Sequence, residues 1–235
     1  MTATIRTGLM TQDEAKLAVA KRAVAFVEDG MHVGLGTGTT ATMFIRELAE
    51  RVKNGLKIRC VASSDASHNL GLSLGMDVTS LNELPDLDVY LDGADEVGPG
   101  LALIKGGGGA LLREKIVASS ARRFIVLVDS TKIVERLGKF PLPVEVVKMA
   151  LPVVLPKLVA LGLNPQQRPT KAGAGPYLTD EGNYIVDCSC GIIADPAQTA
   201  ANIRAIVGVV EHGLFLNMAS LALVAGEAGV TERVA

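Results

Sequence analysis

Met31-His32-Val33-Gly34-Leu35 is a short apolar segment that runs directly into the turn Gly36-Thr37-Gly38-Thr39-Thr40, and a helical pattern follows over residues 41–52. The chain repeats this order of strand, polar turn and helix at 57–74, and apolar strands that end in polar turns recur at 89–96 and 124–132. Strands that alternate with helices are typical of a parallel, doubly wound sheet. We therefore expect an α/β fold here.

The polar turns of this part of the chain all follow the carboxyl ends of their strands, at residues 36–40, 63–65, 92–96 and 129–132. In doubly wound sheets, ligands bind beyond these strand ends. The sheet would therefore bring the four turns together at one edge, where we expect the functional site. Upstream, Thr11 and Glu14 have the spacing of a capping box, which predicts a helix from there to about residue 28.

The pattern changes after the segment 138–143, which is rich in proline and glycine. Strand and helix signals then follow in the order strand, helix, strand, strand, helix, strand, at 144–148, 152–161, within 163–168, 184–188, 195–207 and 209–215. This order is that of the split βαβ unit of ferredoxin-like domains. Residues 216–235 alternate apolar and small side chains, and we expect them to return as strands to the first sheet.

The chain is thus expected to form two domains. Residues 1–138 plus 216–235 would form a doubly wound, mainly parallel α/β domain, and residues 139–215 a smaller ferredoxin-like α+β domain. Few charges occur along 144–161. An exposed apolar helix face in that stretch would favour self-association.

Composition excludes several classes of protein. With 49% hydrophobic and 20% charged residues over 235 positions, the bulk of the chain is not disordered. A net charge of −2 and 3% aromatic residues argue against a nucleic-acid or membrane-surface partner. No stretch approaches the roughly 18 apolar residues of a membrane span. Three cysteines, Cys60, Cys188 and Cys190, suit reduced thiols in the cytoplasm better than a disulfide framework.

The turn at residues 36–40 is a candidate anion site. Glycines let consecutive backbone N–H groups converge, the three threonine hydroxyls add donors, and the start of the following helix adds partial positive charge. The spacing matches neither the dinucleotide fingerprint nor a Walker loop, because the third glycine comes too early and no lysine follows the last one. A small phosphate monoester is the preferred ligand, and a plain capped turn is the alternative.

Two further segments carry charged side chains at strand ends. Asp92-Gly93-Ala94-Asp95-Glu96 places three carboxylates in five residues, which suits sugar hydroxyls, an oxygen-ligated metal or a structural turn. Asp129-Ser130-Thr131-Lys132 offers a cation at another strand end. Taken alone, a lysine such as Lys132 is more often an ordinary surface lysine.

The segment Lys105-Gly106-Gly107-Gly108-Gly109-Ala110 is the least ordinary part of the sequence. Four successive glycines are costly to order, so close approach of the backbone to a ligand explains them better than a plain loop. Lys105 would add one compact positive charge. A helix follows over 111–117, with residues 111 or 112, the stem of residue 115 and Ile116 as its apolar face. Glu114 lies near the first turn of this helix, where it could act in catalysis or simply be solvated.

These motifs, in this order and spacing, resemble ribose-5-phosphate isomerase of type A. The resemblance is carried by residues 36–40, 92–96, 105–110, 113–115, 129–132, 138–146, 179–187 and 208–215. It therefore spans nearly the whole chain. The fourth glycine, Gly109, and the threonine at position 39 depart conservatively from the family pattern.

The resemblance implies interconversion of ribose 5-phosphate and ribulose 5-phosphate through an enediolate, without metal or cofactor, by a homodimer or homotetramer. Glu114 would be the catalytic base. The implied substrate-binding residues are Thr37, Gly38, Thr39, Thr40, Asp92, Gly93, Ala94, Asp95, Lys105, Gly106, Gly107, Gly108 and Lys132. The separate roles of Asp92 and Asp95, and the cation that meets the phosphate, stay open at this stage.

Two rival functions belong to other classes. A non-catalytic sugar-phosphate-sensing protein could share this sheet architecture, but the sequence shows no helix-turn-helix segment or basic arm that would read DNA. A metal-dependent isomerase that works by hydride shift would need a set of His, Asp and Glu ligands, and the sequence offers none at suitable spacing. Turnover of ribose 5-phosphate in the presence of EDTA distinguishes the metal-independent isomerase from both of these rival functions.

Overall fold

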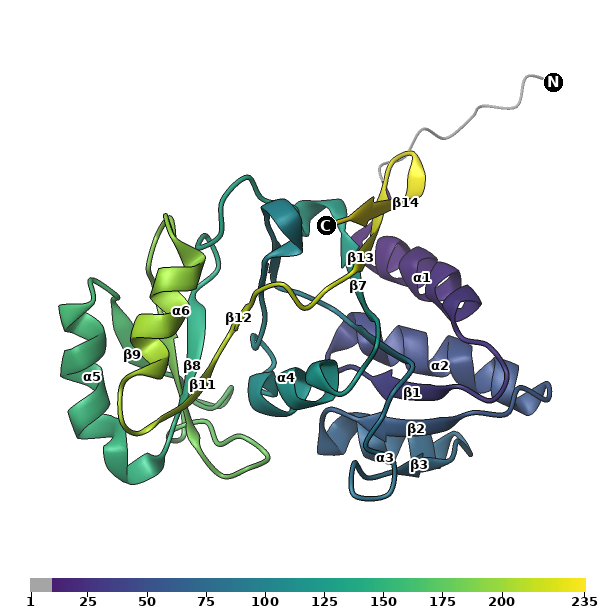
Figure 1. Ribbon diagram of the computed structural model, residues 1–235, viewed down its shortest axis with the longest axis horizontal. Helices are drawn as coiled ribbons and strands as arrows, with labels where there is room; N and C mark the ends of the chain where they lie inside the picture. The colour runs from purple at the N-terminus through teal and green to yellow at the C-terminus, as the bar shows by residue number, and fades with distance from the viewer. Residues whose placement is uncertain (1–9) are drawn as a thin grey trace.

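The computed structural model describes residues 10–235, and its largest element is a seven-stranded sheet with the order β14-β13-β7-β4-β1-β2-β3 (Figure 1). Every pairing in this sheet is parallel except that of β14 with β13. Its strands are β1 (His32–Leu35), β2 (Arg59–Ala62), β3 (Val78–Thr79), β4 (Val89–Asp92), β7 (Phe124–Asp129), β13 (Leu221–Gly226) and β14 (Gly229–Val234). The expected α/β fold is confirmed, and the last two strands do return to this sheet.

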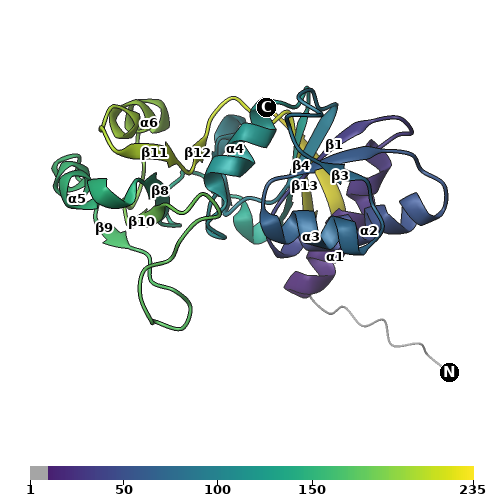
Figure 2. The ribbon, with the colours of Figure 1, turned by 90° about the horizontal axis from the view of Figure 1, so that it is seen from below.

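Helices cover both faces of the sheet (Figure 2). One face packs against α1 (Gln12–Ala23), α2 (Thr39–Lys53) and α3 (Asp65–Ser73), whose apolar residues join those of β1, β4 and β7 in one core. The other face packs against α4 (Leu111–Ser119) through Val117 and Ala118. The predicted capping box at Thr11 and Glu14 is present, but α1 ends earlier than expected and passes into the short 3-10 helix η1 (Val24–Phe26).

A second, antiparallel sheet has the strand order β11-β8-β10-β9. Its elements are β8 (Leu142–Val146), α5 (Leu151–Ala160), β9 (Pro165–Gln167), β10 (Tyr184–Cys188), α6 (Pro196–Arg204) and β11 (Val209–His212). Counted along the chain, the spatial order of the strands is fourth, first, third, second. This order and the two intervening helices confirm the ferredoxin-like prediction.

The two faces of this second sheet differ in chemistry. Leu142, Val144 and Val146 of β8 point into an apolar core that they share with α5 and α6. The alternate residue Glu145 therefore points to the other face, because successive side chains of a strand alternate between its faces. That other face lies against α4, which contacts both β8 and β11. The helix α4 is thus held between the two sheets.

The expected single strand over 209–215 is wrong, because the structure divides it between two sheets. After β11, Gly213 leads into β12 (Leu214–Phe215), which pairs with β6 (Leu103–Ile104) and β5 (Glu96–Val97) in a three-stranded sheet that the sequence did not predict. A Cβ atom on Gly213 would lie 2.2 Å from the carbonyl oxygen of Lys105. Only glycine lets the chain pass this close and change sheets.

Smaller differences concern helix faces and ends. Ile116, expected on the apolar face of α4, is 44% exposed, and the buried residues are Leu111, Glu114, Val117 and Ala118. Because α4 lies between two sheets, one of its buried sides is polar and carries Glu114. The strand β8 lies two residues earlier than expected, and α6 ends before residue 207. Further 3-10 helices are η2 (Pro99–Leu101), η3 (Ser130–Lys132) and η4 (Lys148–Ala150). Among residues 10–235, no helix has the length and apolar character needed to cross a membrane.

Candidate active site

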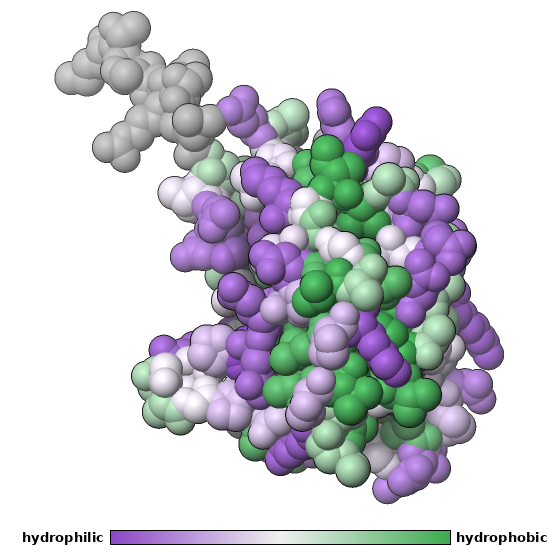
Figure 3. Space-filling model, turned by 90° about the vertical axis from the view of Figure 1, so that its left-hand side faces the viewer, coloured by the Kyte–Doolittle hydropathy of each residue, from purple (hydrophilic) through white to green (hydrophobic). Residues whose placement is uncertain are grey.

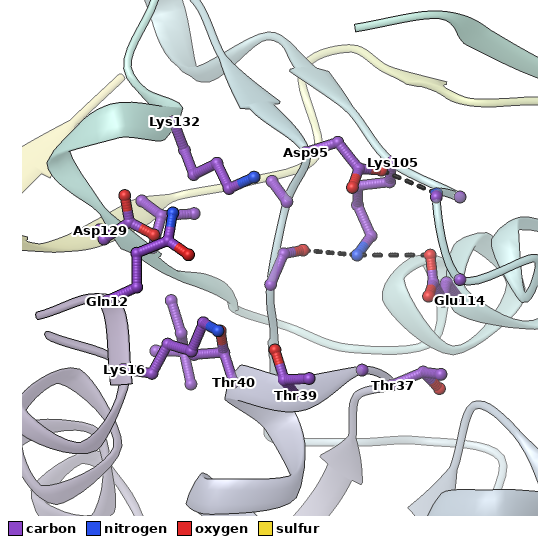
Figure 4. A pocket seen from close by; sticks show the side chains of 18 residues that line it. Gln12, Lys16, Thr37, Thr39, Thr40, Asp95, Lys105, Glu114, Asp129 and Lys132 are labelled. Carbon is purple, nitrogen blue, oxygen red and sulfur yellow. Dashed lines mark hydrogen bonds and ion pairs between the residues drawn. The ribbon is translucent and has the colours of Figure 1, made fainter. Parts of the chain in front are cut away.

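A cavity of about 190 Å³ lies beyond the carboxyl ends of β1, β4 and β7 (Figure 4). Its walls come from the turns after these strands, from α1, from the start of α4 and from the segment 105–110, hereafter the glycine loop. Every residue that the sequence predicted for the site lines this cavity, except Asp92. The sheet therefore brings together residues that are up to about a hundred positions apart in the chain.

The turn after β1 forms one wall of the cavity and leads into α2. Gly36 fits here because a Cβ atom at this position would lie 2.3 Å from Asp92 Oδ1. The backbone N–H of Thr37 donates to the same carboxylate oxygen at 2.9 Å. The turn at 63–65 was expected at the site but does not line the cavity; its Ser63 hydroxyl lies 2.9 Å from the hydroxyl of Thr37 and supports that turn from behind.

Asp92 is fully buried below the cavity wall and does not line it. Its carboxylate accepts hydrogen bonds from Lys105 Nζ at 2.8 Å, from the N–H of Gly93 at 2.7 Å, from Thr37 and from the hydroxyl of Tyr90. With its oxygens satisfied by the protein, this side chain holds the site together. The expectation that Asp92 binds the substrate stays a prediction.

Lys105 is 3% exposed, and its ammonium group has three oxygen neighbours. Nζ lies 2.8 Å from Asp92 Oδ2, 2.6 Å from the carbonyl oxygen of Gly93 and 3.3 Å from Glu114 Oε2. Burial lowers the pKa of Lys105, but the charges of Asp92 and Glu114 outweigh burial and raise it. The side chain is therefore a fixed cation at the cavity wall.

Glu114 reaches the cavity from the first turn of α4 and is 4% exposed. Its Oε2 atom has no hydrogen-bond partner among the described residues 10–235, although it lies 3.3 Å from Lys105 Nζ. Burial raises the pKa of Glu114 to about 8, Lys105 opposes the shift, and Asp92 and Asp95 add to it. A carboxyl group whose pKa lies close to neutral is suited to take up a proton and return it.

Asp95 and the glycine loop form the wall next to Glu114. The N–H of Gly107 donates to Asp95 Oδ2 at 2.8 Å, and burial raises the pKa of Asp95. The third carboxylate of this segment, Glu96, instead accepts from the N–H groups of Gly138 and Phe140, at 2.7 and 2.6 Å. Of the three clustered carboxylates, only Asp95 therefore faces the cavity.

The opposite end of the cavity carries positive charge. Figure 4 shows Lys16 beside Thr40 at the start of α2, on the side of the cavity away from Glu114, and Lys132 on the same side, above Asp129 and Gln12 in this view. Lys16 and Gln12, which reach the cavity from α1, were not predicted as site residues, and neither was Asp129. Only the Asp129 position carried a signal, because it follows a buried strand. Nothing in the sequence shows that α1 begins at this edge of the sheet.

The chain is similar to known proteins in sequence and in fold. A model of the ribose 5-phosphate isomerase A family, also described as phosphoriboisomerase A, matches residues 59–229. A relative from Roseiflexus castenholzii, "Ribose-5-phosphate isomerase A", is 53% identical over 216 residues, which are 91% of this chain and 92% of that protein. The chain belongs to the ribose 5-phosphate isomerase A family. The resemblance seen in the sequence motifs is thus confirmed.

Solved structures of ribose 5-phosphate isomerase A share the fold. The enzyme from Methanocaldococcus jannaschii superposes with a TM-score of 0.91 at 41% identity, over 96% of this chain and 100% of that one. A D-ribose-5-phosphate isomerase solved in complex with phospho-erythronic acid superposes with a TM-score of 0.93 at 37% identity, again over 96% and 100%. Among residues 10–235, the structure places no three His, Cys, Asp or Glu side chains where they could jointly hold a metal ion.

Proposed function

We propose that this chain interconverts D-ribose 5-phosphate and D-ribulose 5-phosphate through an enediolate, a step of the non-oxidative pentose phosphate pathway. The observation that carries the proposal is Glu114, a buried carboxyl group at the wall of the cavity that lies 3.3 Å from Lys105 Nζ and has a pKa of about 8. Family membership and the relatives named as isomerases support the same reaction. The relative solved with phospho-erythronic acid binds a phosphorylated sugar acid.

In the proposed reaction, Glu114 takes the proton from C2 of ribose 5-phosphate, next to the C1 aldehyde, and returns it to C1. The proton of the C2 hydroxyl moves to the C1 oxygen, so that C2 becomes the carbonyl carbon of ribulose 5-phosphate. One carboxylate suffices, since the enediolate offers both carbons to the same base. The developing oxyanion needs a fixed positive partner. Lys105 supplies it, because its Nζ atom is held by Asp92 and Gly93 beside Glu114 before any substrate arrives.

The proposed orientation of the substrate follows from the two ends of the cavity. The phosphate lies near Lys132 and Lys16, where the start of α2 adds its own partial positive charge. The carbonyl end then reaches Glu114 and Lys105. Asp95 also lines the cavity, and we assign it to contact with the sugar hydroxyls and to ring opening. Asp92 is assigned to holding Lys105.

The test is turnover of ribose 5-phosphate by the purified chain with EDTA present. We expect full activity, and the product formed in heavy water should carry solvent deuterium, since a carboxyl proton can exchange during the lifetime of the enediolate. No turnover by a folded chain that binds the sugar phosphate would favour a sensing protein. Turnover that EDTA abolishes would favour a metal-dependent hydride shift.

The phosphate end is tested by Lys132→Ala and Lys16→Ala. Each substitution should raise KM by about tenfold or more with a smaller change in kcat, because it removes one ionic contact that substrate and transition state share. Lys53→Ala, on an exposed lysine at the far end of α2, is the matched control. An unchanged KM in both cavity variants would contradict this placement of the phosphate.

We further propose that the chain divides into an α/β domain (1–138 plus 216–235) and a ferredoxin-like domain (139–215). We also propose that it assembles as a homodimer or homotetramer. Figure 3 shows apolar side chains gathered on the face formed by the ferredoxin-like unit. Exposed apolar residues there include Val153 and Val159 of α5, together with Met149, Ile192 and Val207. The free thiols at residues 60, 188 and 190 support a cytoplasmic location.

A further inference from the structure

The ferredoxin-like unit contacts the glycine loop through one partly buried arginine, Arg168. Arg168 follows β9, at the start of the segment that leads from β9 to β10 on the α4 side of the sheet (Figure 1). Its Nη1 atom donates to the carbonyl oxygens of Gly106 and Gly107, at 3.0 and 3.1 Å. Only 14% of this side chain is exposed, although it does not itself line the cavity.

The protein holds the guanidinium group of Arg168 in place from the opposite side. Asp187 of β10 accepts two hydrogen bonds from it, one of them from Nε at 2.8 Å and the other from Nη2. A bidentate pair of this kind fixes the plane of the guanidinium group as well as its position. The arginine therefore meets the glycine loop in one defined orientation.

A tyrosine from the same segment makes a third contact with the loop. The hydroxyl of Tyr177 donates to the carbonyl oxygen of Gly108 at 3.1 Å, and the guanidinium group of Arg168 lies 5.8 Å from the centre of the tyrosine ring. Three consecutive carbonyl groups of the glycine loop thus point toward the ferredoxin-like unit. Four glycines have little conformational preference of their own, so these contacts, together with the hydrogen bond from the N–H of Gly109 to the carbonyl oxygen of Gly106 at 2.9 Å, give the loop one shape.

The orientation of these carbonyl groups determines where the N–H groups point. In a trans peptide the C=O of one residue and the N–H of the next point in opposite directions, and the described chain has no cis peptide. The N–H of Gly107 accordingly meets Asp95. The N–H of Gly108 has no hydrogen-bond partner within residues 10–235, and because it opposes the carbonyl group of Gly107, it points away from Arg168. Gly108 itself lines the cavity.

We propose that Arg168, held by Asp187, is a positioning residue that turns the peptide groups of the glycine loop so that the Gly108 N–H faces the substrate beside Lys105. This inference rests on the proposed isomerase function and deepens it. It gives the ferredoxin-like unit a part in catalysis, because the loop that contacts the substrate takes its shape from that unit. Arg168 itself touches no reacting atom.

The experiment compares kcat and KM of the wild-type chain, Arg168→Ala and Arg168→Lys, with and without added guanidinium ion. We expect kcat of Arg168→Ala to fall about 10-fold to 100-fold, as is typical when a group at the site is misplaced by about 1 Å. KM should change much less, because the phosphate contacts lie at the other end of the cavity. Guanidinium ion should restore part of the lost kcat by filling the space next to Asp187.

Two further variants separate this role from a purely structural one. Arg168→Lys keeps a cation beside Asp187 and should fold, but one ammonium group cannot reproduce the bidentate pair and both loop contacts, so kcat should fall at least tenfold. Arg59→Ala removes an arginine from an exposed pair with Asp77, remote from the cavity, and should change neither kcat nor the response to guanidinium.

The proposal is overturned if Arg168→Lys, or a folded Arg168→Ala, retains kcat within twofold of the wild type. It is also overturned if the lost kcat of Arg168→Ala does not recover with guanidinium, since a general loss of stability would give that result. The activity of the wild-type chain distinguishes failure of the proposed function from failure of the proposed role of Arg168. An inactive wild-type chain removes the proposed function and this inference together, whereas an active wild-type chain with an equally active arginine variant removes only the inference.

Discussion

Glu114 and Lys105 show how burial changes the chemistry of two ordinary side chains. Their charged atoms lie 3.3 Å apart, and each residue is less than 5% exposed. In water such a pair would simply be two ions. Here the loss of hydration favours the neutral form of Glu114, while Asp92 keeps Lys105 charged. The pair therefore consists of a permanent cation and a carboxyl group ready to exchange a proton.

Replacing Glu114 by Gln should lower kcat by about 10³-fold to 10⁴-fold, because the amide cannot take up the proton. The shape of the side chain is kept, so an unreactive phosphorylated sugar acid should still bind with nearly wild-type affinity, as measured by calorimetry. Glu50→Gln, on the exposed face of α2, serves as the control and should be fully active. Turnover close to normal in Glu114→Gln would remove this residue from the role of base.

The pH dependence of kcat/KM should follow the ionisation of Glu114. Only the carboxylate form can accept a proton, and burial raises the pKa of this group to about 8. The rate should therefore rise as the pH increases toward 8 and level off above it. The second ionisation of a phosphate monoester lies near pH 6, so the two steps can be separated in the profile. A rate that is flat from pH 6.5 to pH 9 would contradict the assignment.

At the scale of single elements, the site depends on places where two backbones approach closely. The turn after β1 meets Asp92 across Gly36, and the chain changes sheets at Gly213 next to Lys105. Both close approaches lie next to Lys105 or to its ion-pair partner Asp92. The elements that carry Lys105 and Glu114 are therefore positioned by packing that leaves no room for a methyl group.

Gly36→Ala tests this packing. Its Cβ atom would lie 2.3 Å from Asp92 Oδ1, so the free energy of unfolding should fall by about 1–3 kcal/mol, as is typical of overpacked sites. The measurement is urea-induced unfolding. Gly93→Ala is the matched control for stability, because its nearest neighbour would be at an ordinary 3.7 Å. Equal stability of the two variants would show that the turn has room to adjust.

At the scale of the whole molecule, each of the three sheets contributes residues or contacts to the site. The parallel sheet carries the turns at 37–40 and 93–95 and also Lys132, whereas Lys105 and the glycine loop follow β6 of the three-stranded sheet. The antiparallel sheet packs against α4 and contacts the glycine loop through Arg168. The face of the antiparallel sheet covered by α5 and α6 is remote from the cavity. Its exposed apolar residues are thus free for contact with a second copy of the chain.

Val153→Glu tests this surface. Val153 is 54% exposed on α5, and a charge at the centre of an apolar contact would have to lose its hydration. Light scattering should give the mass of a dimer or tetramer for the wild type and a lower mass for this variant. Leu72→Glu, on the similarly exposed Leu72 of α3, should keep the wild-type mass. A monomeric wild type, or an unchanged mass in Val153→Glu, would exclude assembly through α5.

The sequence alone established the α/β class, the ferredoxin-like order of the second half and thirteen of the eighteen residues that line the cavity. These features are local: strand periodicity, turn residues and a run of glycines can all be recognised within a dozen positions. The fourteenth predicted residue, Asp92, lies at the expected strand end but is buried behind the cavity wall. Nothing local shows that its oxygens are already used by Lys105 and Tyr90.

Only the tertiary structure revealed that Lys16 reaches the cavity from α1, that residues 209–215 are shared between two sheets, and that Arg168 holds the glycine loop. Each of these facts joins segments far apart in the chain. A side chain such as Arg168 has the same local signature whether it faces solvent or a distant backbone. Its role depends on how the two sheets pack, and the sequence pattern around it does not encode that contact.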